Sequence, residues 1–222
     1  MRYSGVPAPH TIALFAAAAL ALLLIPGPAV LYIVTRSVTQ GRRAGFVSVL
    51  GIHAGTLVHV AAAAFGLSAI LVRSSAAFHA VKYAGAAYLI FLGIRRLVTE
   101  VPLTNGDDAL EVVPNRQLFV NGAVVNILNP KTALFFLAFL PQFVDPERGS
   151  VSLQVVVLGA LFVAIGLCSD STYALLASRF GSWLRTSPSF RHGQRYVAGG
   201  IYVGLGVTAA LAGSRATTTA SS

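Results

Sequence analysis

The chain has 222 residues, of which 55% are hydrophobic and only 10% are charged, and its mean hydropathy is +0.74. Soluble domains carry about 25% charged residues, so this composition excludes an ordinary water-facing surface. The formal net charge is +9, but the arginines lie in short connections between apolar runs, which is typical of membrane topology rather than of nucleic-acid binding. We therefore predict an all-α integral membrane protein in a lipid bilayer, with no nucleic-acid partner.

Six apolar stretches are each near the roughly 20 residues that a helix needs to cross a bilayer. They cover residues 11–35, 44–72, 76–97, 118–144, 151–177 and 196–212. A polar linker at residues 98–117 separates a three-helix half at 1–97 from another at 118–212, and residues 213–222 have the composition of a disordered tail. An odd number of spans in each half inserts the halves in opposite directions. We therefore expect six transmembrane helices arranged as a 3+3 inverted repeat.

Arginine positions predict the orientation of these spans. Ten arginines lie in the first, third and fifth connections, against four in the termini and the even connections. The positive-inside rule then places the odd connections, with the linker, in the cytoplasm and both termini on the other side of the membrane. With five spans instead of six, one terminus would be inverted, and the sequence leaves that alternative open.

Two of the predicted spans, the first and the fourth, are interrupted by proline. The first contains Pro26-Gly27-Pro28 and the fourth contains Asn129-Pro130. Proline removes a backbone donor, and the freed carbonyls need partners from protein or from a wet cavity. Breaks at matching places in two halves indicate a transporter's binding site, where new helix N-termini favour a carboxylate. A plain kink is the alternative for each break.

Two ionisable side chains, Lys131 and Asp170, lie deep within predicted spans. A charged group at that depth indicates function by default. We expect the two either to pair or to share an aqueous cavity, and we predict Asp170 as the proton carrier of a coupled transporter. The alternatives are a structural ion pair, or a Lys131 side chain that extends to the membrane interface.

Four further polar residues in the spans are candidates. Asn126 and Asn129 share a helix face and either bind a zwitterionic substrate or satisfy the carbonyls freed at Pro130. His53 and Thr56 are secondary candidates in the second span. His53 and His59 lie ~120° apart around a helix, which suits interhelical hydrogen bonds better than a chelate. We predict no metal site and no cofactor.

Motifs in the first four spans carry a family resemblance. They are Pro26-Gly27-Pro28, Gly41-Arg42-Arg43-Ala44-Gly45, Leu50-Gly51-Ile52-His53-Ala54-Gly55, Ala64-Phe65-Gly66-Leu67, Lys82-Tyr83-Ala84-Gly85-Ala86-Ala87-Tyr88-Leu89, Asn126-Ile127-Leu128-Asn129-Pro130-Lys131 and Phe135-Phe136-Leu137-Ala138-Phe139-Leu140-Pro141-Gln142-Phe143. On these residues the chain resembles the LysE/RhtB family of bacterial amino-acid exporters, over nearly its whole length.

The resemblance implies export of an amino acid from the cytoplasm, driven by the proton motive force, with both proline breaks important for function. Many relatives carry an aspartate directly after the second glycine of the second span, where this chain has Thr56. The missing carboxylate favours a neutral substrate, such as threonine or homoserine, over a basic one. The oligomeric state stays open between a monomer and a homo-oligomer.

Two other functions compete with amino-acid export. Divalent-metal export would use His53, His59, Cys168 and Asp170, whose spacings form no recognised ligand cluster. An intramembrane enzyme would need a nucleophile or a paired-acid motif within the spans, and the sequence shows neither. We therefore expect a transporter and not an enzyme.

Overall fold

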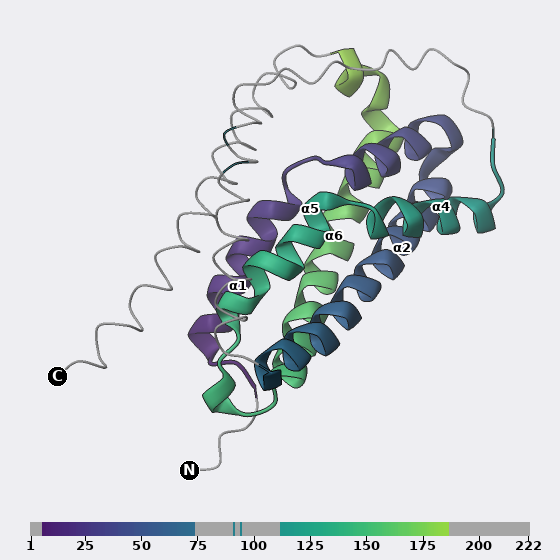
Figure 1. The fold of residues 1–222 in the computed structure, drawn as a ribbon. Coiled ribbons are helices and arrows are strands. Elements are labelled where there is room, and N and C mark those ends of the chain that lie inside the picture. Colours follow the sequence, from purple (N-terminus) through teal and green to yellow (C-terminus); the bar gives the residue numbers. More distant parts are fainter. Residues whose placement is uncertain (1–5, 74–90, 92–93, 95–111, 187–222) are drawn as a thin grey trace.

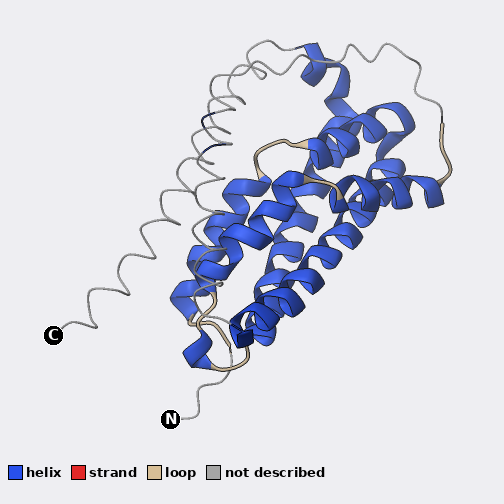
Figure 2. Cartoon of the chain, viewed as in Figure 1, coloured by secondary structure: helices blue, strands red, loops and turns tan. Residues whose placement is uncertain are grey.

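The computed structural model describes residues 6–73, 91, 94 and 112–186, and the ordered elements of this part are all helical (Figure 2). It covers the first, second, fourth and fifth predicted spans. Most of the third span, the sixth span, most of the linker and the tail lie outside the described residues. The six-helix repeat as a whole therefore remains a prediction.

The first predicted span consists of two helical pieces. Helix α1 (Pro9–Leu23) begins with proline at its first position, where the missing N–H costs no hydrogen bond. The chain leaves the helix over residues 24–27, which we term the first break, and α2 (Pro28–Arg73) follows. Gly41, at φ 81° and ψ 178°, interrupts α2 with a backbone conformation that favours glycine. Residues 28–40 thus complete the first span, and residues 42–73 form the second.

The fourth predicted span is also broken, as expected. It contains α4 (Asn115–Ile127) and α5 (Pro130–Leu134), separated by residues 128–129, which we term the second break, and the helices on its two sides meet at a bend of 48°. After α5 the backbone widens into a π-helical turn, η1 (Phe135–Phe139), and then tightens into a 3₁₀ turn, η2 (Leu140–Phe143). The sequence did not predict this change of helix type.

The fifth span is the unbroken helix α6 (Val151–Thr186), which extends nine residues beyond its predicted end at 177. A short 3₁₀ turn, η3 (Pro146–Arg148), precedes it. Helix α6 packs against α2 and α1. The main core lies between these helices and η1, and it is strongly aromatic: the ring centroids of Phe135 and Phe162 are 4.8 Å apart.

The two broken spans run in opposite directions (Figure 1). At the middle of α1, Phe15 packs edge-on against Phe143 at the end of η2, with ring centroids 5.3 Å apart. The C-terminal end of α1 lies near the second break, since Leu22 and Asn129 line the same cavity. The first break and the second break therefore lie side by side, as an inverted arrangement requires.

Close contact between α2 and α4 depends on glycine. A Cβ atom at Gly51 would collide with the carbonyl of Phe119, and one at Gly55 would lie 2.6 Å from the carbonyl oxygen of Ala123. The Gly51-x-x-x-Gly55 spacing thus lets the two helices approach closely.

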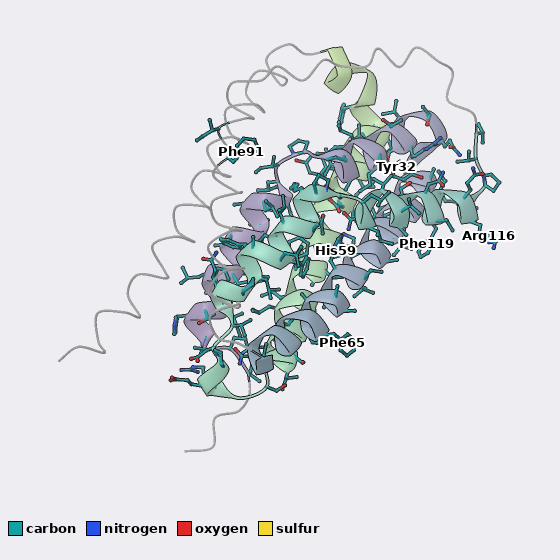
Figure 3. The ribbon with its side chains drawn as sticks, viewed as in Figure 1. Tyr32, His59, Phe65, Phe91, Arg116 and Phe119 are labelled. Carbon is teal, nitrogen blue, oxygen red and sulfur yellow. The ribbon has the colours of Figure 1, made fainter. Side chains whose placement is uncertain are left out.

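The outer surface of the described helices is apolar. Phe65 is 79% exposed and points away from the protein (Figure 3). By length and hydropathy, Pro28–Gly66 and Val151–Phe180 can each cross a bilayer, and the bent pair α4–η2 makes a third span. Because Gly41 divides the first of these, we assign residues 28–40 to the span that α1 begins. Exposed apolar side chains on helices of this length match contact with lipid.

We predict that Gly55→Ala lowers the free energy of unfolding by about 1–3 kcal/mol, because the added methyl group forces α2 and α4 apart. Thermal unfolding in detergent measures this loss. The control is Gly66→Ala in the same helix, where a Cβ meets no atom within 4 Å. Equal melting temperatures for the two variants would contradict the close helix contact.

Candidate functional site

The first break leaves backbone carbonyls without helical partners. The carbonyl of Leu24 would accept from the residue four positions on, which is Pro28 and has no N–H. Instead it accepts a hydrogen bond from the hydroxyl of Tyr173 on α6, at 2.9 Å. The next carbonyl, that of Ile25, accepts from the ammonium group of Lys131 on α5. Side chains from the second half of the chain thus satisfy the break in the first half.

Gly27 provides the space through which Lys131 reaches this carbonyl. A Cβ atom at Gly27 would lie 3.2 Å from Cδ of Lys131, closer than an ordinary van der Waals contact. The lysine stem therefore lies against the glycine backbone. The glycine of the Pro-Gly-Pro motif therefore has a packing reason.

The second break is stabilised by its own asparagine. The side-chain oxygen of Asn129 accepts a hydrogen bond from the backbone N–H of Lys131 at 3.1 Å, which caps the start of α5. The Asn129 amide nitrogen donates to Oδ1 of Asn126 at 3.2 Å. Both asparagines are 2% exposed, so these bonds form away from solvent.

Asn126 is the hub of the polar network between α4 and α2. Its amide nitrogen donates to the carbonyl of Ile52 and to the hydroxyl of Thr56, both at 2.9 Å. Its amide oxygen accepts from Thr132 at 2.9 Å as well as from Asn129. All four hydrogen-bonding positions of the amide are occupied within the protein. The Asn126 side chain thus links α4 to α2 and α5, and its two donors reach Ile52 and Thr56 rather than the carbonyls freed at Pro130, which was one of the two uses expected from the sequence.

His59 supports the same break from α2. Its Nε2 lies 3.0 Å from the backbone carbonyl oxygen of Asn126, and its ring stacks on that of Phe136, with centroids 6.2 Å apart. Figure 3 places His59 between α2 and the bent helix. The predicted interhelical hydrogen bond of His59 is confirmed.

The matching prediction for His53 is wrong. Its Nε2 lies 3.1 Å from Oδ2 of Asp170 on α6, within ion-pair distance, but neither ring nitrogen has a hydrogen-bond partner in this structure. Helices α2 and α6 therefore meet here at ion-pair distance without a hydrogen bond. Gly166 makes room for the ring, because a Cβ there would collide with Cε1 of His53.

A small cavity of about 30 Å³ lies where the two breaks meet. Lys131 and Asp170 both line it, and Asp170 is 3% exposed. Of the two arrangements expected for this acid and base, the structure thus has the shared cavity; the Lys131 ammonium contacts a backbone carbonyl, and Asp170 faces a histidine. The volume holds about two water molecules.

Most of the predicted site residues come together at this cavity. Seven of the ten line it, and of the three prolines Pro26 lies in the first break while Pro28 and Pro130 begin the helices that follow the breaks. The seven are Gly27, His53, Thr56, Asn126, Asn129, Lys131 and Asp170. The hydroxyl of Thr56, at the position where many relatives have aspartate, donates to the Ile52 carbonyl at 3.2 Å and accepts from Asn126.

Sequence reasoning missed Tyr173 and Thr132. Tyr173 follows Asp170 by three positions, so the two share a face of α6, and this spacing was an available signal. The residues of the metal alternative do not form a site, because among the described residues no three His, Cys, Asp or Glu side chains are grouped to hold a metal ion.

We predict that Asn126→Leu destabilises the fold by about 1–3 kcal/mol for each buried polar group that it leaves unpaired. The groups at risk are the amide of Asn129 and the hydroxyl of Thr132. Asn115→Leu, at the exposed start of α4, is the control and should change stability by no more than ~0.5 kcal/mol. Chemical unfolding in detergent compares them, and similar losses would contradict the role of Asn126 as a hub.

Comparison with known proteins gives the family. A family model described as LysE type translocator matches residues 20–213. The chain is 32% identical over 166 residues to the homoserine/homoserine lactone efflux protein of Salmonella typhimurium, covering 74% of this chain and 79% of the relative. It is 30% identical over 189 residues to an uncharacterized membrane protein of Vibrio cholerae, covering 85% and 91%.

A third relative, an uncharacterized membrane protein of Bacillus subtilis, is 26% identical over 211 residues and aligns with 91% of this chain and 99% of its own. No solved structure matches the chain. The family match spans most of the chain, and its members are transporters rather than enzymes. The chain belongs to the LysE type translocator family of membrane proteins.

Proposed function

We propose that this protein exports a small amino acid from the bacterial cytoplasm in exchange for protons, and that the substrate binds where the two helix breaks meet. The observation that carries the proposal is the shared cavity, which is lined by both breaks, by one buried acid and by one buried base. A transporter site at paired, oppositely directed helix breaks follows from the chemistry of backbone groups in a membrane. The efflux protein from Salmonella supports the amino-acid class.

The cavity offers complementary groups for a zwitterion. Helix α2 starts at Pro28 beside the cavity, and the N–H groups of Ala29 and Val30 in its first turn have no acceptor within the helix. Such a helix start and the Lys131 ammonium both attract a carboxylate. Thr56, in place of an aspartate, leaves Asp170 as the carboxylate at the cavity. We therefore propose a neutral amino acid, such as threonine or homoserine, ahead of a basic one.

The structure represents a closed conformation in this proposal. A cavity that holds about two water molecules is too small for any amino acid. The breaks must therefore separate during transport, and each break offers a place where the chain can bend.

We propose that the protein crosses the membrane six times, with the odd connections in the cytoplasm. We propose one site in each copy of the chain, because the residues that line the cavity all come from one copy.

Asp170 is proposed as the proton carrier, because it is buried, lies beside His53 and faces the substrate cavity. In proteoliposomes, the wild-type protein should accumulate threonine or homoserine against its gradient when a pH gradient is imposed. Asp170→Asn should lose this uphill transport by at least about tenfold, because the neutral amide cannot carry the proton, and should keep counterflow exchange when the amino acid is present at saturating concentration.

The matched control is Asp145→Asn, at the cap that precedes η3, where the carboxylate is about half exposed, and it should behave as the wild type does. A wild-type protein that moves no amino acid in either assay would overturn the proposed function. Normal uphill transport by Asp170→Asn, or loss of exchange together with uphill transport, would remove Asp170 from the coupling role alone.

A further inference from the structure

We propose that the Lys131 ammonium group occupies, in the closed protein, the position that the substrate's own ammonium group takes during transport. The subsite consists of the freed carbonyl of Ile25 and the carboxylate of Asp170. This inference rests on the proposed function and specifies how its site recognises an amino acid.

The carbonyl side of the subsite follows from the first break. The helical partner of the Ile25 carbonyl would be the N–H of Ala29, which lies across the break in a new helix. Ile25 is 3% exposed, so its carbonyl needs a donor from the protein or from a ligand. In this conformation the donor is the Lys131 ammonium. A primary ammonium group of a ligand can donate to the Ile25 carbonyl in the same way.

The carboxylate side is incomplete without a further donor. Asp170 directs Oδ2 at His53, whereas its Oδ1 is buried and has no hydrogen-bond partner in this structure. Both Asp170 and Lys131 line the cavity. The Lys131 ammonium makes no ion pair with Asp170 in this conformation and serves the Ile25 carbonyl alone. An ammonium group has three donors, so a substrate ammonium held between the two groups can donate to the Ile25 carbonyl and to an oxygen of Asp170. The unpaired oxygen thus indicates a cationic ligand at this end of the cavity.

A zwitterion can replace the lysine without leaving a charge alone. When the substrate's ammonium takes the place at Ile25 and Asp170, the displaced Lys131 ammonium can pair with the substrate's carboxylate. Every buried charge keeps a partner, and the net charge of the cavity is unchanged, which matters because an unpaired charge at membrane depth is costly. A ligand that lacks the carboxylate would leave Lys131 without a partner. The exchange therefore selects molecules that carry both groups.

A purely structural role for Lys131 makes a different prediction. If the lysine served only as a clamp on the first break, its removal would impair transport of every ligand to the same extent. If it pairs with the substrate carboxylate, its removal must impair binding of carboxylate-bearing ligands selectively. The comparison needs two ligands that differ only in that group.

The test uses homoserine and propanolamine, which is homoserine without its carboxylate. In proteoliposomes, counterflow of labelled homoserine is measured against unlabelled homoserine, propanolamine or γ-hydroxybutyrate, which is homoserine without its ammonium. For the wild type, both single-charge analogues should compete at least about tenfold more weakly than homoserine, because each leaves a buried charge unpaired. This competition measurement uses the wild-type protein only, so it can be made even if a substituted protein fails to fold.

Lys131→Met should reduce the preference for homoserine over propanolamine by about tenfold or more, whereas Lys131→Arg should retain the preference. Arg116→Met, a cation removed at the exposed start of α4, is the control and should match the wild type. Equal inhibition of the wild type by all three ligands, or an unchanged preference in Lys131→Met, would overturn the inference. Absence of exchange in the wild type with homoserine and with threonine alike would instead overturn the proposed function on which the inference rests.

Discussion

A backbone carbonyl that is released from a helix inside a membrane has no water to bind, and the architecture of this protein follows from that constraint. The first break releases the carbonyls of Leu24 and Ile25, and their partners are Tyr173 and Lys131, from the other half of the chain. Neither half can satisfy its own break fully. The contact between the halves is therefore also the contact that forms the cavity.

The backbone groups released at the two breaks are satisfied in different ways. The second is held mostly by local side chains, with Asn129 capping α5 and Asn126 linking it to α2. The first depends on two side chains from the other half of the chain, Tyr173 and Lys131, and the lysine stem lies against Gly27. In the proposed function, the charges of the substrate replace the contacts that the lysine gives up.

The sequence predicted the helices and the breaks well, because both signals are local. Pro26-Gly27-Pro28 and Asn129-Pro130 remove backbone donors wherever they occur in a helix, and the long apolar runs fix the helix lengths. The pairing of groups across helices could not be predicted in the same way. His53 and Asp170 meet because α2 and α6 take particular rotations about their axes, and glycines such as Gly166 set those rotations through packing. The π-helical turn at Phe135–Phe139 likewise depends on the aromatic core rather than on local propensity.

The most direct test of this account is the contact between Lys131 and Ile25 in a lipid bilayer. The chain has two lysines, Lys82 and Lys131, so protein isotope-labelled at lysine Nζ and at the isoleucine carbonyl carbons gives a simple solid-state NMR experiment. Dipolar recoupling should show a lysine nitrogen within hydrogen-bonding reach of an isoleucine carbonyl, and the signal should disappear in Lys131→Met. A wild-type spectrum without that coupling would contradict the joined breaks on which the site depends.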